Sequence, residues 1–405
     1  MKIKFYRKVL ENGMTVLLEK RDNPIVSVAI AIRRGGAYEE EHEKGISHFI
    51  EHLLYKGTKN RTSKQIAEEI ESLGGDINGF TDQLLTVYWC KLPSKHLKVA
   101  LDVLSDMVKN PLFNDEDIEK ERKIIFEEIK MRRDSPGIYV RDKIHNLLYK
   151  KPFGADLIGT YKSMSSITRE QIIRRFRDFY VPRNMILGVV GNANFGQLIN
   201  FAKKNFKSDS IKKIKKISEP KIILRNKTCI EKRKGLDQAN LVLSYHVPLS
   251  GNKKSYAAYI LNVLTTGGMS SRLFFEIREK RNLAYAIKGD SEITKYFGYN
   301  SIYVGTKKEK VGEIKKIILK EFEKIAKSLD KKEFKKIKEQ IIGNYQISIE
   351  DSQTQLTNLL MYEIDGNAKE FYNFEKNIKS VKLKDVRDLA ETARKKYSFF
   401  VLLPS

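Results

Sequence analysis

The sequence predicts an α+β fold of two homologous domains, each a mostly antiparallel sheet covered by helices. A chain of 405 residues exceeds what one hydrophobic core usually serves. Strand patterns are interleaved with clusters of helical patterns, which favours a sheet covered on one face by helices in each half. A helix opening near Ser166 precedes the apolar strand that starts at Met185, and a helix opening near Ser380 precedes the strand that starts at Phe399. Because both halves end alike, the sequence indicates an internal repeat.

The elements of the first half follow from local signals. A short helix ends before Gly57, because glycine commonly follows a helical terminus. Thr62 and Gln65 have the spacing of a capping box, so another helix begins there and ends at Gly74. The other elements expected are strands at 14–19, 26–33 and 185–190, an extended hairpin at 77–92, and helices at 46–55, 96–109, 115–133 and 168–179.

A change of composition separates the two halves. Residues 207–216 are basic and show little periodicity, which is typical of a linker. We therefore expect an N-terminal domain over 1–206, a basic linker over 207–226 and a C-terminal domain over 227–405. The second half restarts with a strand at 241–246 and has no histidine pair in the place of the first half's 46–55 helix. Any metal chemistry is therefore expected in the first half alone.

The net charge of +25 comes from 76 basic and 51 acidic residues. This excess would suit a binder of nucleic acid or of anionic surfaces, or a Lys/Glu-rich protein of a heat-loving organism. The lysines are spread over helical faces such as 307–338 and are not gathered around aromatic residues. A generally solvated basic surface is therefore favoured over a nucleic-acid site.

Several absences indicate a cytoplasmic protein without a membrane partner. No apolar run approaches the roughly 18 residues that a membrane span requires. The start of the chain leads directly into a strand pattern, without the apolar stretch of a signal peptide. The two cysteines, Cys90 and Cys229, lie in apolar contexts, so neither a disulfide scaffold nor a cysteine zinc site is expected and a reducing compartment fits.

The segment His48-Phe49-Ile50-Glu51-His52 is the most informative in the chain. On a helix, positions i, i+3 and i+4 share a face, so His48 and His52 can bind one metal ion. Glu51 lies beside them and can take a proton from a metal-bound water, which is the chemistry of the H-x-x-E-H motif. Composition alone predicts only about 0.01 such patterns. The alternative, two surface histidines on an amphipathic helix, is therefore disfavoured.

Two histidines do not complete a catalytic zinc site, which uses three protein ligands and one open position. Glu121 and Glu128, in the helix expected at 115–133, are seven residues apart and share a face. Glu127 is the adjacent competitor, and a run of alternating charges is ordinarily a solvated helical face. The spacing alone leaves the third ligand open.

The segment 45–58 around this motif resembles the signature of the pitrilysin/insulinase family of zinc peptidases, especially its processing-peptidase branch of two-domain subunits. The resemblance extends over most of the chain. It implies a third glutamate ligand in a Glu-Glu-Ile context, which places Glu128 in the ligand position. Glu121 then matches the acid that orients a ligand histidine through its other ring nitrogen. One Zn²⁺ per chain is implied, although manganese or cobalt could substitute.

Two further stretches are similar to this family. The segment 74–81 resembles the edge strand that aligns the peptide substrate, which implies substrate-binding roles for Asn78, Gly79, Phe80 and Thr81. The family more often has alanine where Gly79 stands, a departure that leaves strand pairing possible.

The second of these stretches lies in the C-terminal half, where segment 267–285 is similar to a family region in which an arginine and a tyrosine seven residues apart reach the substrate near the zinc. Arg278 and Tyr285 have that spacing. Without the family, Arg278 would be a helix-surface charge and Tyr285 a strand aromatic of the kind usually found in a core.

We therefore expect a zinc-dependent endopeptidase that hydrolyses peptides or unfolded segments. The three ligands would hold a zinc ion that activates a water and polarises the scissile carbonyl. Glu51 would move the proton, and Tyr285 with Arg278 nearby would stabilise the oxyanion. The resemblance implies that each domain forms half of a clamshell around a closed chamber, with closure about the 207–216 linker as its gating step.

Two rival functions remain at this stage. The first is a non-catalytic or partner-dependent subunit of a hetero-oligomer, because the family contains members that lost the metal motif. Both the metal motif and the Arg278/Tyr285 pair are present here, so a homodimer acting on peptides is preferred. The second is a basic nucleic-acid-binding protein, whose affinity would fall steeply with salt and survive removal of the metal.

Overall fold

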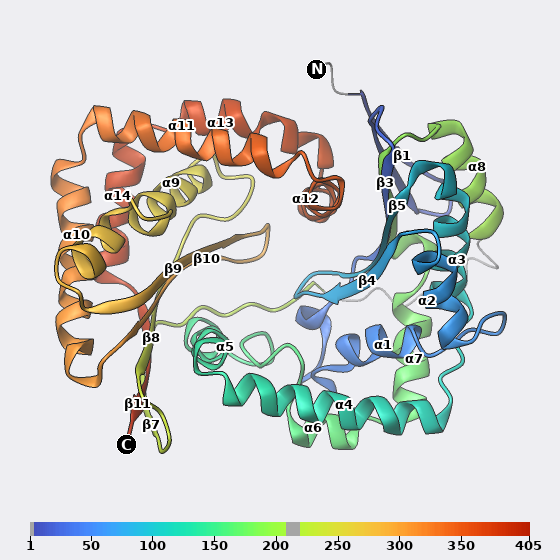
Figure 1. Cartoon of the computed structure of the whole chain (residues 1–405), viewed down its shortest axis with the longest axis horizontal. Coiled ribbons are helices and arrows are strands. Elements are labelled where there is room, and N and C mark those ends of the chain that lie inside the picture. The colour runs from blue at the N-terminus through green and yellow to red at the C-terminus, as the bar shows by residue number, and fades with distance from the viewer. Residues whose placement is uncertain (1–3, 208–218) are drawn as a thin grey trace. The chain divides into compact units, whose positions relative to one another are not determined.

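The computed structural model describes residues 4–207 and 219–405 (Figure 1). Most of the predicted linker, residues 208–218, lies outside the described residues. The chain divides into two compact units, each made of three segments of the sequence. The first unit comprises Met1–Ile129, Leu157–Pro220 and Ser348–Phe371, and the second comprises Lys130–Asp156, Lys221–Ile347 and Tyr372–Ser405.

The first unit contains a six-stranded sheet in the order β1-β2-β6-β3-β5-β4 (Figure 1). All neighbours are antiparallel except β2 and β6, and β4 lies at one edge. The strands in chain order are β1 Lys4–Val9, β2 Thr15–Lys20, β3 Ile25–Ile32, β4 Asp76–Thr81, β5 Thr86–Pro93 and β6 Met185–Gly191.

The second unit repeats this topology in a five-stranded sheet of order β7-β11-β8-β10-β9. Its single parallel pair, β7 with β11, corresponds to β2 with β6. The strands that begin at Met185 and Ser398 hold equivalent places, which confirms the internal repeat and the mostly antiparallel sheets. The strands are β7 Thr228–Arg233, β8 Ala239–His246, β9 Ala284–Ile293, β10 Gly298–Thr306 and β11 Ser398–Pro404.

The helices are divided between the two units. Those of the first unit are α1 Ile46–Leu54, α2 Ser63–Glu71, α3 Leu97–Lys109, most of α4 Asp115–Asp134, α6 Tyr161–Ser166, α7 Arg169–Phe179, α8 Phe195–Asn205 and α12 Ser352–Asp365. Those of the second are α5 Pro136–Leu148, α9 Ser255–Thr266, the π-helical η5 Phe274–Glu279, α10 Val311–Ser328, nearly all of α11 Lys331–Ser348, α13 Phe374–Ser380 and α14 Leu383–Lys395. Short 3₁₀ turns are η1 Gly36–Tyr38, η2 Glu41–Glu43, η3 Ser94–His96, η4 Pro182–Asn184, η6 Lys308–Lys310 and η7 Ala368–Asn373.

The sequence predicted helices on one face of each sheet, and this prediction is wrong because the other face is covered as well. Side chains alternate along a strand, so residues that point away from the main core need their own cover. On the first sheet α12 supplies it: the hydroxyls of Ser27 and Ser352 are 2.8 Å apart, and Gln355 donates to Glu19 over 2.6 Å. A helix from the second half of the sequence therefore completes the first unit.

Close packing and buried charge fix α12 to this face. A Cβ on Gly188 of β6 would lie 2.7 Å from Cδ1 of Leu356, so glycine leaves room for this buried side chain of α12. The buried carboxylate of Glu363 accepts hydrogen bonds from Arg7 over 2.8 Å and from Arg33 over 2.9 Å. These bonds lower the pKa of Glu363 although burial alone would raise it.

The second sheet receives a helix in return, α5, to which the sequence analysis assigned no element. The Ser398 hydroxyl of β11 donates to the carbonyl oxygen of Leu147 over 3.0 Å, and the rings of Tyr139 and Phe400 are 6.2 Å apart. Each compact unit is thus completed by a helix from the other half of the sequence. The units therefore do not coincide with contiguous stretches of the chain.

The start of α1 is fixed by a buried acid that the sequence analysis did not single out. The carboxylate of Glu39 accepts from the backbone N–H of Gly45 over 3.0 Å and of Ser47 over 2.7 Å. A carboxylate on the first N–H groups of a helix also complements the helix dipole. Gly45 has φ +97, and a Cβ there would lie 2.6 Å from the carbonyl oxygen of Ile158. The positive φ and the close carbonyl oxygen both require glycine immediately before α1.

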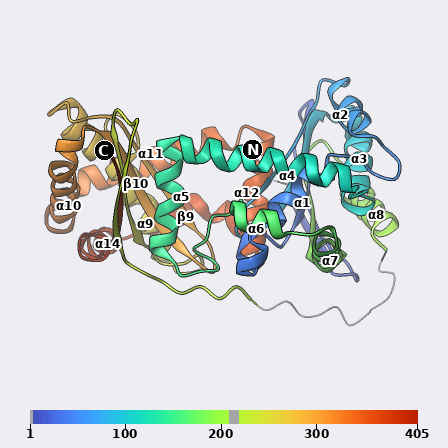
Figure 2. The same ribbon diagram turned by 90° about the horizontal axis from the view of Figure 1, so that it is seen from below.

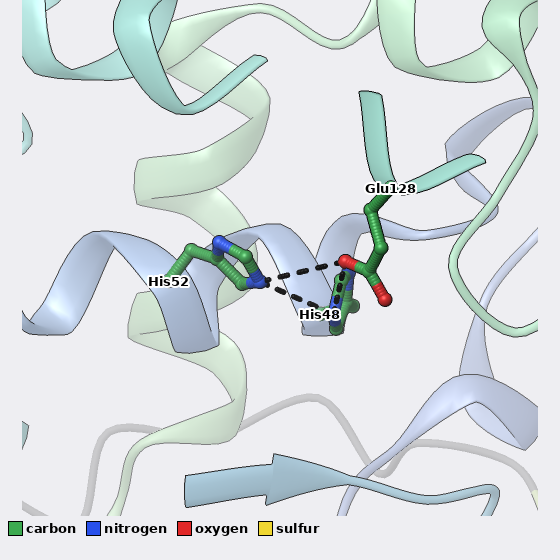
Figure 3. A group of neighbouring side chains, drawn as sticks. All are labelled: His48, His52 and Glu128. Carbon is green, nitrogen blue, oxygen red and sulfur yellow. Dashed lines mark hydrogen bonds and ion pairs between the residues drawn. The ribbon is translucent and has the colours of Figure 1, made fainter. Parts of the chain in front are cut away.

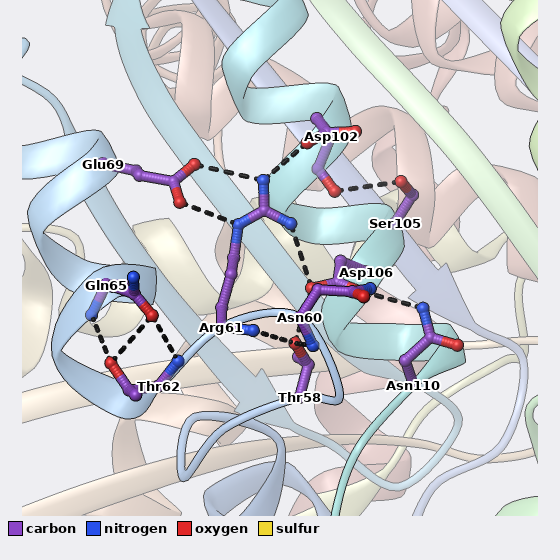
Figure 4. A network of polar contacts seen from close by, with 10 residues as sticks. All are labelled: Thr58, Asn60, Arg61, Thr62, Gln65, Glu69, Asp102, Ser105, Asp106 and Asn110. Atoms are coloured by element: carbon purple, nitrogen blue, oxygen red, sulfur yellow. Dashed lines mark hydrogen bonds and ion pairs between the residues drawn. The ribbon is translucent and has the colours of Figure 1, made fainter.

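The loop after α1 is tied to α2 and α3 by a polar network (Figure 4). Arg61 donates to Glu69 over 2.9 Å, to Asp102 over 2.5 Å and to Asp106 over 3.0 Å. Thr58 also donates to Asp106, over 2.6 Å. Burial alone would raise the pKa of Asp106, but the hydrogen bonds that it accepts lower it. Both ends of α1 are therefore held in place.

Candidate metal centre

The two histidines of α1 meet on one face of the helix, as their spacing predicts. Their Nε2 atoms are 3.2 Å apart, and the side chain of His48 is almost wholly buried (Figure 3). The residues of α1 on the other side, among them Phe49, Ile50 and Leu53, belong to the apolar core of the first unit. Burial of these residues holds the histidine face outward from the core, towards α4.

Glu128 completes the group from α4, which runs alongside α1 (Figure 2). Its Oε2 lies 3.5 Å from Nε2 of His48 and 3.9 Å from Nε2 of His52. Donors about 2.05 Å from a tetrahedral zinc ion would be about 3.3 Å from one another. Two imidazoles and a carboxylate are also a ligand set of hydrolytic zinc sites. Within residues 4–207 and 219–405, His48, His52 and Glu128 are the one metal-binding group found, and they fit zinc.

Glu121 lies two helical turns before Glu128 on α4, and its carboxylate contacts the ring of His52. Its Oε2 is 3.0 Å from Nδ1 of His52, and its Oε1 accepts from Lys56 over 2.7 Å. Burial alone would raise the pKa of Glu121, but its hydrogen bonds with His52 and Lys56 lower it. An ionised Glu121 accepts the Nδ1 proton of His52, which leaves the Nε2 lone pair available to a metal.

Glu51 lies beside the metal-binding group without joining it. Its side chain is buried, and its Oε2 accepts a hydrogen bond from the hydroxyl of Thr81 over 2.7 Å. Burial raises the pKa of Glu51, while the bond from Thr81 and the neighbouring His52 act in the opposite direction. A carboxylate with a raised pKa is a stronger base than an ordinary surface glutamate.

The residues of the predicted substrate strand form β4, at the free edge of the first sheet. Asn78 is exposed, and Gly79, Phe80 and Thr81 are half-buried. An edge strand carries main-chain groups that can pair with an extended peptide. Thr81 is the member whose side chain reaches Glu51.

Arg278 and Tyr285 are brought together by the fold of the second unit. Arg278, in η5, donates from Nη1 to the carbonyl oxygen of Tyr285 over 3.2 Å and lies 5.0 Å from the ring of Phe274. Tyr285 is the second residue of β9 and is 62% exposed, so it is not a core aromatic. His48, His52, Glu51 and Glu128 belong to the first unit, whereas this pair belongs to the second.

Sequence reasoning missed three residues that shape the site. Glu39 caps α1, Lys56 pairs with Glu121, and Tyr55 places its buried hydroxyl near Glu51. Tyr55 and Lys56 follow His52 within four residues, at the C-terminal end of α1, so their nearness to the motif was a usable signal. Glu39 had none, because it reaches the helix through a loop.

The chain matches two family descriptions in succession. Residues 15–161 match "Insulinase (Peptidase family M16)" and residues 166–341 match "Peptidase M16 inactive domain". It is 32% identical to an uncharacterized zinc protease of Rickettsia felis, over 98% of this chain and 96% of that one. It is 30% identical to the uncharacterized zinc protease YmxG of Bacillus subtilis, over 98% of both chains. The chain therefore belongs to the M16 family of peptidases, which confirms the resemblance read from the sequence.

Solved structures support the same fold. A protease from Helicobacter pylori superposes with a TM-score of 0.92 at 22% identity, covering 99% of this chain and 100% of that one. A peptidase M16 inactive domain from Pseudomonas fluorescens gives a TM-score of 0.84 at 19% identity, covering 100% and 99%. The α+β fold of two M16-type domains is confirmed. None of the helices in the described part of the chain combines the length and apolar character needed to traverse a bilayer.

Proposed function

We propose that the protein is a zinc-dependent endopeptidase that hydrolyses unstructured peptides. The observation that carries the proposal is the convergence of His48, His52 and Glu128 on one point, in a chain of the M16 family. These three residues would hold the zinc ion. When bound there, zinc supplies an activated water and polarises the scissile carbonyl.

Glu51 is the proposed general base. It lies on the same helix as both histidines, it is held by Thr81, and burial raises its pKa. It would accept a proton from the attacking water at its carboxylate and later deliver that proton to the leaving amine. Glu121 would keep His52 in the tautomer that offers Nε2.

The substrate would be bound by main-chain pairing. The free edge of β4, at Asn78, Gly79, Phe80 and Thr81, would add the peptide as a further strand, so only extended segments would be accepted. In the same proposal Tyr285, with Arg278 beside it, would hydrogen-bond the carbonyl oxygen as it becomes negatively charged. The exposure of the Tyr285 side chain supports this, because a buried tyrosine could not contact a substrate.

The experiment is digestion of an unfolded protein by the purified chain, with fragments identified by mass. Chelation should abolish cleavage and added zinc should restore it. Glu51→Gln should keep its zinc but lose at least about 10²-fold in kcat. Glu68→Gln, an exposed change on α2, is the matched control and should keep wild-type activity. Equal cleavage by metal-free protein would refute the assignment.

The rival function is a partner-dependent subunit of a hetero-oligomer. It predicts that the purified chain binds zinc and cleaves nothing until a homologous partner is added. Our proposal includes a cytoplasmic homodimer, for which light scattering should give about twice the chain mass of 46.9 kDa. Cell fractionation tests the location, and we expect no nucleic-acid or membrane partner.

A further inference from the structure

Strand β4 turns one face towards α1. Because side chains alternate along a strand, Gly79 and Thr81 share a face, and Asn78 and Phe80 share the other. The Thr81 hydroxyl donates to Oε2 of Glu51 over 2.7 Å, so Thr81 faces the proposed base. Its side chain is therefore engaged within the protein, and only its main chain is left for a substrate strand.

The distance between β4 and α1 depends on Gly79. A Cβ at this position would lie 2.7 Å from the hydroxyl oxygen of Tyr55, 2.7 Å from the carbonyl oxygen of Val87 and 3.4 Å from Oε1 of Glu51. Contacts below 3.0 Å require something to shift, and the contact with Val87 is to the backbone of β5, so movement of a side chain cannot relieve it. The φ of Gly79 is not in the left-handed region. Glycine is thus required here for close approach and not for backbone conformation.

Tyr55 fills the room that a side chain at position 79 would need. It is the C-cap residue of α1, and its hydroxyl is buried without a hydrogen-bond partner among the described residues. Burial, with the nearby charge of Glu51, raises the pKa of Tyr55, so the hydroxyl stays protonated. The hydroxyl and Oε1 of Glu51 lie against the same point of β4.

We propose that Thr81 is a positioning residue for Glu51, and that Gly79 and Tyr55 form a matched pair that keeps β4 close enough to α1 for Thr81 to reach it. The inference rests on the proposed function. One strand would then both pair with the substrate and orient the base.

The first test removes the hydroxyl while keeping the shape. Thr81→Val should lower kcat about 10- to 100-fold, the usual effect of losing a hydrogen bond to a charged group, with KM and zinc content unchanged. Thr81→Ser keeps a hydroxyl and should recover most of the activity. Thr228→Val, an exposed threonine on β7, is the matched control and should change nothing.

The second test addresses the spacing. Gly79→Ala should lower kcat because its methyl group meets the Tyr55 hydroxyl and moves β4 away from α1. Adding Tyr55→Phe should restore part of that loss, since it removes one of the two closest contacts and leaves the one with Val87. Combined with Thr81→Val, Gly79→Ala should cost little more, because both changes break the same hydrogen bond.

The outcomes separate this inference from the proposed function. Wild-type protein without zinc-dependent cleavage would overturn both. Active wild type with an unchanged Thr81→Val variant would overturn the inference alone, and so would a loss confined to KM, which would make Thr81 a substrate contact. If circular dichroism shows that Thr81→Val folds poorly, the kcat of Thr81→Ser is compared with that of Gly79→Ala. Equal values would refute the positioning role.

Discussion

The acid that holds His52 offers a quantitative test of the metal centre. Glu121 is 4% exposed at its side chain and uses both oxygens, one on Nδ1 of His52 at 3.0 Å and one on Lys56 at 2.7 Å. Glu121→Gln keeps the shape but removes the charge, and its amide nitrogen would face either Lys56 or the Nδ1 proton. Loss of such an orienting contact typically weakens metal affinity 10- to 100-fold, or about 1.4 to 2.8 kcal/mol.

The assay is zinc affinity measured by competition with a coloured chelator at neutral pH. Glu116→Gln is the matched control, because Glu116 lies on the same helix, is 79% exposed at its side chain and pairs with Lys120 at the surface. Such exposed pairs contribute little to stability. Zinc affinity of Glu121→Gln equal to that of the control would refute the orienting role. Circular dichroism of both variants would show that the fold is retained.

Four further predictions concern other parts of the molecule. Glu128→Ala should lose zinc while Glu127→Ala keeps it, because adjacent helical residues point about 100° apart; metal analysis checks this. Tyr285→Phe should lower kcat by about 10²-fold with a smaller change in KM, measured by steady-state kinetics. Because folding lowers the pKa of Asp106, its ionised form stabilises the fold at pH values above the ordinary aspartate pKa of about 3.9. The free energy of unfolding should therefore fall as the pH drops below that value, and it should fall less steeply in Asp106→Asn. Urea titrations at pH 3 to 6 measure this difference. A chain ending at residue 206 lacks α12 and should show no cooperative thermal unfolding, and a sharp calorimetric transition would contradict the exchanged-helix architecture.

Local features of the site were accessible from the sequence. The histidine pair and Glu51 lie on α1, whose ends are within one residue of the expected bounds. The capping box between Thr62 and Gln65 is present at the start of α2. The hairpin of β4 and β5 was also expected. These features depend on contacts between residues a few positions apart, which a helical or strand period determines directly.

The sequence left the choice between Glu127 and Glu128 to the family resemblance, and only the packing of α4 against α1 places Glu128 beside the histidines. The contact of Glu39 with the start of α1 likewise depends on tertiary packing.

The unbroken apolar run of β6 is typical of a strand covered on both faces, and all its residues are buried. No local sequence feature indicates that α12 is the helix that covers the second face.

By itself, the sequence predicted a repeated α+β domain and a helix that carries two histidines on one face with Glu51 beside them, because residue spacing along one helix or strand decides which side chains share a face. Tertiary structure alone decided that α12 completes the first unit and α5 the second, and that Thr81 reaches Glu51 beside Gly79. Those contacts join segments far apart in the chain, and their distances are set by how helices and strands pack, down to single methyl groups.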